Sequence, residues 1–274
     1  MTYNTSMKVA VAAIATAFLA VSAPAQVKPK LTELGGEPAH SLLWVGNSFF
    51  YFNNGINRHI TGLTNAAGRE GRLRNVMVTI GGAGIDWHDL EAYLKPGSKV
   101  GWYSFVGDNE IVFNKPGRQF DTAIVMDCSQ CPIHPQLKST FQEYVKKDAE
   151  TARKYGARPV FFMSWAYKDK PEMIGPLADA YTTEANANDA FVIPAGLAFA
   201  KAIARRPELE LYQPDKRHPT LAGTYLAACT SIAALTGKTP VGNTYTAGLD
   251  AQTVEFLQSV AWDTVQEYFG KAAK

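Results

Sequence analysis

The chain has 274 residues, of which 46% are hydrophobic and 19% are charged. These values are typical of a globular protein and exclude a disordered chain. With 27 Lys and Arg against 25 Asp and Glu, charge gives no reason to expect nucleic acid or an anionic membrane as a partner. The length suits one domain, which we expect at 41–274, after a polar, extended leader at 26–40.

The segment 1–25 is typical of a secretory signal peptide. Lys8 precedes an apolar run at 9–21, and Ala23 and Ala25 are the small residues that a signal peptidase reads. The run is short for a membrane span, and no cysteine follows Ala25 to carry a lipid. We therefore expect a periplasmic or secreted protein with no membrane anchor after cleavage. An N-terminal amphipathic anchor is the alternative.

Short apolar runs alternate with amphipathic segments along the rest of the chain. This alternation predicts a three-layer α/β fold, a doubly wound, flavodoxin-like sheet of five parallel strands with helices on both faces. The expected strand order is 2-1-3-4-5. In chain order, the expected elements are strand 42–46, helix 56–67, strand 74–80, helix 87–93, an inserted hairpin of 102–106 and 110–113, strand 122–126, helix 137–155, strand 159–163, helix 171–188, strand 190–193, and helices 197–206, 221–235 and 251–269.

Three local details accompany these elements. Asp86 is expected to cap the helix at 87–93, because its side chain can accept hydrogen bonds from the first turn. Gly175-Pro176 is expected to interrupt the helix at 171–188. His59 is expected on the exposed side of the first helix.

A serine follows the first predicted strand. Gly46, Asn47 and Ser48 come directly after the apolar run, so Ser48 lies where open α/β sheets place their chemistry. Late in the chain, Asp215 and His218 are three residues apart. Ser, His and Asp can form a nucleophile, its base and the group that orients the base. The alternatives are that Ser48 caps a helix, Asp215 forms a turn and His218 is a surface histidine.

These residues resemble the motifs of the SGNH (GDSL-like) hydrolase superfamily, in an exported variant with Gly-Asn-Ser in place of Gly-Asp-Ser. The matching blocks are scattered over roughly 42–219. The resemblance implies a serine esterase in which Ser48 is the nucleophile, His218 the base and Asp215 its orienting carboxylate. In that family, the aspartate at the position of Asn47 is a structural support.

The resemblance also implies an oxyanion hole. Its donors would be the backbone N–H groups of Ser48 and Gly82 and a side chain after the third strand. The family's asparagine is missing from that last block, which reads Met-Asp-Cys-Ser-Gln-Cys. Gln130 is the preferred replacement because a carboxamide is the closer donor, and the hydroxyl of Ser129 is the alternative.

Several side chains near this predicted site are candidates for the substrate pocket. Half or more of the aromatic residues there are expected in the core, and the remainder could bind a sugar ring or an acyl chain. The candidates are Asn47, Phe49, Trp87, His88 and Trp165.

The three cysteines allow several interpretations. Cys128 and Cys131 could form a local disulfide in an oxidising compartment, act in redox chemistry, or simply pack. Cys229 lies in an alanine-rich helical run and is expected in the core. No second cysteine pair and no His-x-x-x-His pattern exists, so we expect no metal, and we expect no cofactor.

The leading hypothesis is an exported serine hydrolase that cleaves a carboxylic ester through a Ser-His-Asp triad and an acyl-enzyme. Its expected partner is a small-molecule or carbohydrate ester, with an O-acetyl group on a carbohydrate as one candidate. The alternative is a catalytically weak or inactive SGNH-like protein that binds a glycan, which the missing asparagine favours. A thiol redox protein that uses Cys128 and Cys131 is the third hypothesis.

Overall fold

The computed structural model describes residue 1 and residues 26–68, 73–115 and 117–271. The predicted signal peptide therefore lies almost entirely outside the described residues. The strands are β1 (Ser41–Gly46), β2 (Arg74–Thr79), β3 (Tyr103–Phe105), β4 (Ile111–Phe113), β5 (Thr122–Val125), β6 (Arg158–Phe162) and β7 (Phe191–Ile193).

Five of these strands form one parallel sheet in the order β2-β1-β5-β6-β7, and β3 and β4 form a separate antiparallel hairpin. With the hairpin set aside, this order is the predicted 2-1-3-4-5. The fold class and the inserted hairpin are thus confirmed.

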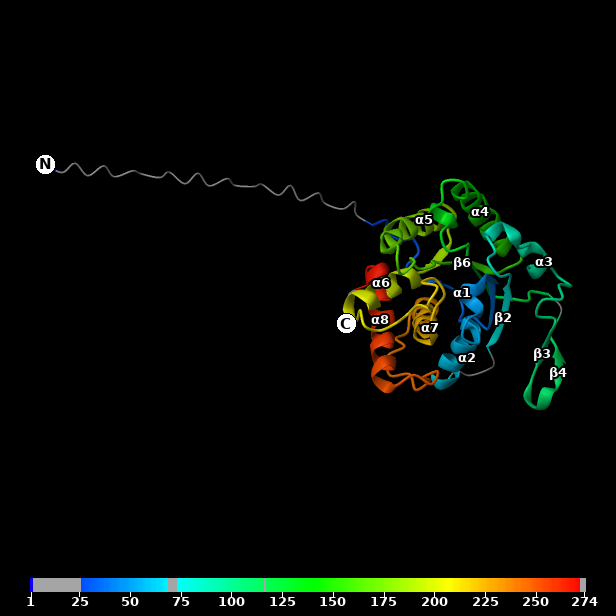
Figure 1. Cartoon of the computed structure of the whole chain (residues 1–274). Coiled ribbons are helices and arrows are strands. Elements are labelled where there is room, and N and C mark those ends of the chain that lie inside the picture. The colour runs from blue at the N-terminus through cyan, green and yellow to red at the C-terminus, as the bar shows by residue number, and fades with distance from the viewer. Residues whose placement is uncertain (2–25, 69–72, 116, 272–274) are drawn as a thin grey trace.

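Helices cover both faces of the sheet (Figure 1). The helices α3, α4 and α5 lie on one face, and α2, α6, α7 and α8 lie on the other. The helices are α1 (Ser48–Tyr51), α2 (Ile56–Ala66), α3 (Leu90–Leu94), α4 (Lys138–Lys154), α5 (Ile174–Ala187), α6 (Ala195–Arg205), α7 (Leu221–Thr236) and α8 (Ala251–Tyr268), with short 3₁₀ turns η1 (Ile85–Trp87), η2 (Gly107–Asn109), η3 (Cys131–Ile133) and η4 (Pro171–Met173).

The first strand, β1, lies inside the sheet, paired in parallel with β2 on one side and β5 on the other. A strand in that position is covered on both faces, which explains its unbroken apolar run. Leu43, Trp44 and Val45 are fully buried. The indole of Trp44 donates a hydrogen bond of 2.6 Å to Asn75 Oδ1 on β2, which satisfies its one polar atom. This packing fixes the point where the chain leaves β1 and reaches Ser48.

Two local predictions were wrong. The cap of the short helix α3 is Asp89, whose side chain accepts from Ala92 N, and Asp86 lies inside the preceding 3₁₀ turn. Pro176 does not interrupt a helix, because α5 begins only at Ile174. Proline is tolerated in a first turn, where its missing N–H has no helical partner anyway.

The leader is tied to the domain along α5 and β6. The side chain of Asp179 accepts from Val27 N, and Asn186 Oδ1 accepts from Lys30 N at 2.7 Å. Further along, the Arg158 guanidinium donates to the carbonyl oxygens of Gly35 and Glu37. Across the described ranges, no helix combines the length and the apolar character needed to span a bilayer.

Candidate active site

The structure brings Ser48, His218 and Asp215 into one hydrogen-bonded chain. His218 Nε2 lies 2.8 Å from Ser48 Oγ, and His218 Nδ1 is hydrogen-bonded to Asp215 Oδ2. A carboxylate can only accept, so Nδ1 carries a proton and Nε2 is left as the acceptor for the serine hydroxyl. The serine and the histidine are 170 residues apart in the sequence.

Asp215 serves both the histidine ring and the turn that carries it. Its Oδ1 accepts from the backbone N–H groups of Arg217 and His218, while its Oδ2 accepts from the imidazole. Burial by itself would raise the pKa of Asp215, but these hydrogen bonds outweigh it and lower the pKa to about 2. The group is therefore a carboxylate at any ordinary working pH. Asp215 thus forms the turn through Oδ1, as the alternative interpretation predicted, and contacts the imidazole through Oδ2.

Two further hydrogen bonds hold the backbone on either side of His218. The indole of Trp165 donates to Arg217 O at 2.9 Å, and the side chain of Asn53 donates to Pro219 O at 2.9 Å. The Phe52 ring stacks on the imidazole, with centroids 4.2 Å apart and an interplanar angle of 13°. Sequence reasoning missed Asn53 as a site residue, and it placed Phe52 only within a cluster of aromatic residues near the expected mouth of the site. Their position four and five residues after Ser48, at the end of a short helix, was the only available signal.

Asn47 joins three strand ends beneath the serine. It is 4% exposed, and its Nδ2 donates to Ala83 O after β2 and to Asp127 O after β5. Its Oδ1 accepts from Phe49 N, so Asn47 is the N-cap of α1. The alternative in which Ser48 caps the helix is thus wrong, because Ser48 is the first helical residue.

Asp127 is a second brace at the same place, and sequence reasoning gave it no role. It is 2% exposed, and its Oδ1 accepts from Ile85 N at 2.8 Å and from Cys128 N at 2.7 Å. Its Oδ2 is buried without a hydrogen-bond partner among the described residues. Burial raises the pKa of Asp127 to about 6, and the nearby Asp86 adds to this rise. The carboxyl thus links the loop after β2 to the loop after β5.

The predicted oxyanion-hole donors differ in whether they already make a hydrogen bond within the protein. Ser129 Oγ is hydrogen-bonded to Tyr167 Oη at 2.5 Å. In the part of the chain that the structure describes, no hydrogen bond is assigned to the backbone N–H of Ser48, the backbone N–H of Gly82 or the Gln130 carboxamide. Gly82 has a φ of +74°, a backbone conformation that favours glycine.

Most of the predicted substrate-pocket residues are buried, which corrects that prediction. Phe49 and Trp165 stack at 4.6 Å, and Trp165 also stacks on Phe199 at 4.2 Å, so these rings form the core behind the triad. His88 is 4% exposed and its Nε2 lies 2.9 Å from Gly46 O, so it supports the end of β1. The side chain of Asn47 is buried and makes hydrogen bonds with Ala83, Asp127 and Phe49. Of the five candidates, Trp87 alone is exposed, at 59%.

His59 was also misplaced by sequence reasoning. It is buried in α2, with Nε2 2.8 Å from Asn53 O and Nδ1 3.1 Å from Tyr245 Oη. Burial lowers its pKa, so the neutral ring is favoured. It therefore supports the segment that carries Asn53, at the edge of the triad.

Cys128 and Cys131 are joined by a disulfide, and Cys229 is buried with a free thiol. Among the described residues, one group has the spacing of metal ligands, and it consists of Asp127, Cys128 and Cys131. Because the sulfurs are bonded to each other, they offer no thiolate to a metal. The disulfide closes the loop that holds Ser129 and Gln130.

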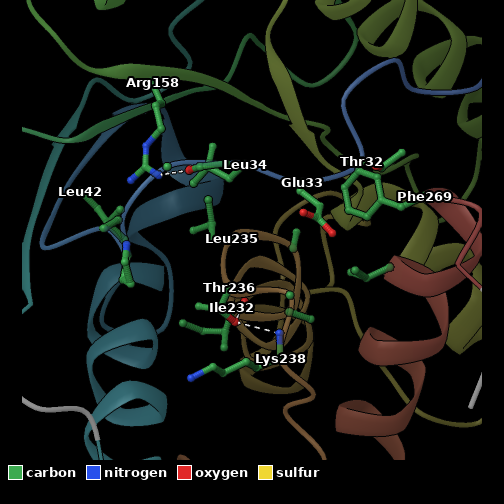
Figure 2. A pocket seen from close by; sticks show the side chains of 18 of the residues that line it. Thr32, Glu33, Leu34, Leu42, Arg158, Ile232, Leu235, Thr236, Lys238 and Phe269 are labelled. Atoms are coloured by element: carbon green, nitrogen blue, oxygen red, sulfur yellow. Dashed lines mark hydrogen bonds between the residues drawn. The ribbon is translucent and has the colours of Figure 1, made fainter.

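A cavity of about 440 Å³ lies elsewhere (Figure 2). Its wall includes Leu42, near the start of β1, and Arg158, the first residue of β6. The cavity therefore opens at the amino end of the sheet, and Ser48 follows the carboxyl end. None of the triad residues lines it. The cavity is therefore separate from the hydrogen-bonded chain of Ser48, His218 and Asp215.

Comparisons with solved structures identify the fold. A DUF4886 family protein from Bacteroides uniformis aligns with a TM-score of 0.59 at 20% identity, over 85% of this chain and 96% of that one. A candidate SGNH hydrolase from Slackia heliotrinireducens aligns at 0.53 and 20% identity, over 72% and 98%. The fold is that of the SGNH hydrolases.

An acetyl xylan esterase variant from Geobacillus stearothermophilus also aligns, with a TM-score of 0.51 at 14% identity, over 75% of this chain and 97% of that one. No protein-family model and no curated protein matches the sequence. At these identities the likeness establishes the α/β fold and leaves the chemistry to be argued from the site.

Proposed function

We propose that this protein is an exported serine esterase that hydrolyses a carboxylic ester through an acyl-enzyme. The observation that carries the proposal is the contact of 2.8 Å between Ser48 Oγ and His218 Nε2, with Asp215 on the other ring nitrogen. A serine hydroxyl is a weak nucleophile unless an adjacent base takes its proton. The unprotonated Nε2 is within reach to do so.

In the proposed reaction, Ser48 Oγ attacks the ester carbonyl while His218 accepts its proton. His218 then returns that proton to the leaving alcohol. In the second half of the reaction, His218 accepts a proton from a water molecule that attacks the acyl-serine, and it returns the proton to Ser48 as the acid leaves. Asp215 remains ionised and stabilises the imidazolium that forms. Its low pKa, about 2, supports this role because the carboxylate never competes for the proton.

We assign the oxyanion hole to the backbone N–H groups of Ser48 and Gly82 and to the Gln130 carboxamide. Ser129 is the weaker candidate, because its hydroxyl is already bonded to Tyr167. Loss of one such donor typically lowers turnover by about 10²–10³-fold. Gln130→Ala should show a fall of that size on p-nitrophenyl acetate, and Ser129→Ala should change turnover much less. The reverse ranking would transfer the role to Ser129.

We propose an acylated carbohydrate, with O-acetyl as the acyl group, as the substrate class. The support is one structural neighbour that is an acetyl xylan esterase, which is an analogy at the level of the fold. Export is supported by the signal-peptide pattern and by the disulfide between Cys128 and Cys131, since disulfides persist in oxidising compartments.

A fluorophosphonate probe tests the nucleophile directly. The wild-type protein should be labelled and Ser48→Ala should not, while Ser129→Ala serves as a matched control that keeps its label. His218→Ala should lower kcat on p-nitrophenyl acetate by at least roughly 10³-fold. A Ser48→Ala protein that still turned over the ester would exclude Ser48 as the nucleophile. Glycan binding by a wild-type protein with no labelling would identify a binding protein instead.

A further inference from the structure

Arg217 precedes His218 and carries a positive charge that no acid neutralises. Its guanidinium carbon lies 4.8 Å from the centroid of the Tyr167 ring, which is a cation–π contact. The residue is exposed, and no carboxylate in the described part of the chain forms an ion pair with it. Its backbone is held on both sides, because Arg217 N donates to Asp215 and Arg217 O accepts from Trp165. The cation is therefore anchored and open to solvent.

The Tyr167 ring connects this cation to the opposite wall of the site. Tyr167 is 5% exposed, and its hydroxyl lies 2.5 Å from Ser129 Oγ. Ser129 is next to Gln130, the proposed oxyanion donor, in the loop that the disulfide closes. The contacts from Arg217 through Tyr167 to Ser129 therefore run from the turn that carries the base to the loop that carries that donor. This places the guanidinium on the rim of the active site.

The spacing of the strands sets the reach that a substrate needs. Ser48 follows β1 and Tyr167 follows β6, and β5 lies between these two strands. Neighbouring strands are about 4.8 Å apart, so β1 and β6 are separated by about 10 Å. The leaving alcohol takes its proton from His218, so the alcohol part of the ester lies on the side of the turn that carries Arg217. A group one sugar ring away from the ester oxygen would thus reach the guanidinium.

The other charges on this side of the site are largely paired. The pairs are Lys168 with Glu210, Lys216 with Asp169, and His218 with Asp215. Arg217 leaves a net positive charge here, and Lys170, exposed on the loop after β6, adds to it. On the opposite rim, Asp86 is exposed in the 3₁₀ turn that follows Gly82. An anionic group on the substrate is therefore attracted to the Arg217 side and repelled from the Asp86 side.

A guanidinium presents parallel N–H groups that match the two coplanar oxygens of a carboxylate. Uronic acids carry a carboxylate on the same ring as the hydroxyls that can be acylated. We propose that Arg217 binds the carboxylate of an acylated uronic acid, so that the preferred substrate is an acidic carbohydrate ester. This inference rests on the proposed esterase function and adds the charge of the alcohol part. A sulfated sugar offers a negative charge without the planar pair of oxygens, and the test separates the two.

The test compares kcat/KM for acetate release from three O-acetylated methyl glycosides: a glucuronide, its neutral carboxamide and a glucoside 6-sulfate. The wild type should prefer the glucuronide to the carboxamide by about tenfold. This preference should fade between about 50 mM and about 500 mM NaCl. Arg217→Gln should abolish the preference, and Arg217→Lys should retain part of it. The matched control is Lys238→Gln, which removes an exposed charge beside the cavity at the amino end of the sheet and should keep the preference in full.

The outcomes separate this inference from the proposed esterase function. A wild type that hydrolyses p-nitrophenyl acetate but treats the glucuronide and its carboxamide alike overturns the role of Arg217 and leaves the esterase intact. So does a preference for the glucuronide that Arg217→Gln keeps. A stronger preference for the sulfate would replace the carboxylate with a sulfated substrate. A protein that hydrolyses neither p-nitrophenyl acetate nor any of the three glycosides refutes the esterase, and the inference fails with it.

Discussion

Replacing Asp127 by Asn should change how the stability of the protein depends on pH. Asp127 is 2% exposed, and burial raises its pKa from 3.8 to about 6 in the folded protein. An asparagine has the same shape and can still accept hydrogen bonds from Ile85 N and Cys128 N through its amide oxygen. The substitution thus removes the titrating carboxyl group and keeps both hydrogen bonds that link the two loops.

The direction of this pH dependence follows from the difference between the pKa of Asp127 in the folded state and its pKa in the unfolded state. The folded state holds the proton more tightly, so protonation of Asp127 favours folding below about pH 4, and this contribution is lost as the pH rises through about 6. A shift of roughly two pKa units corresponds to about 3 kcal/mol at 1.36 kcal/mol per unit. The wild type should lose this amount between about pH 4 and pH 7, and Asp127→Asn should not.

Urea unfolding at a series of pH values, with the disulfide intact, measures this directly. The quantity to follow is the free energy of unfolding of Asp127→Asn minus that of the wild type. It should rise by about 3 kcal/mol in favour of the variant between about pH 4 and pH 7. Titrating groups that do not interact with Asp127 cancel in the difference. A difference that stays constant over this range would show that the carboxyl is not held in the protonated form by burial.

Three other variants extend the reasoning. For Asp148→Asn, the free energy of unfolding relative to the wild type should also rise with pH, but up to a higher pH, because burial raises the pKa of Asp148 to about 7. Urea unfolding across the same pH series checks this. Asn47→Ala should lower the free energy of unfolding by about 2–3 kcal/mol and also reduce kcat, since two carbonyl groups and one N–H lose their buried partner. Replacing Cys128 and Cys131 together by serine should cost about 2 kcal/mol, the loop-closure value for so short a loop, as measured by thermal unfolding against the wild type with and without reductant.

The fold could be predicted because its signal is local. The apolar run of β1 and the helical spacing of α4 each record the burial of that segment alone. The strand order was predicted because 2-1-3-4-5 is a common order among doubly wound sheets. Helix ends were less certain, as Asp86 and Asp89 show, because both residues can cap and only the path of the chain decides between them.

The site was predictable only where a short motif carried it. Ser48, Asp215 and His218 follow from two motifs, whereas the residues that position them depend on contacts between distant segments. His59 is buried because Tyr245, 186 residues later, covers it, and no helical pattern within α2 reveals that. In the same way, Phe49 was a candidate for the substrate pocket, but its stack on Trp165 places it in the core.

Asn47 and Asp127 meet opposite hydrogen-bonding needs between the ends of β2 and β5. A carboxylate can only accept hydrogen bonds, but the groups that face Asn47 from the ends of β2 and β5 are two carbonyl oxygens, which need a donor. The N–H groups that need an acceptor, from Ile85 and Cys128, are met by Asp127 instead. Between the ends of β2 and β5, Asn47 is therefore the donor and Asp127 the acceptor, while the amide oxygen of Asn47 accepts from Phe49 N within its own turn. An Asn47→Asp variant would set a carboxylate against two carbonyls and should be less stable than Asn47→Ala above neutral pH.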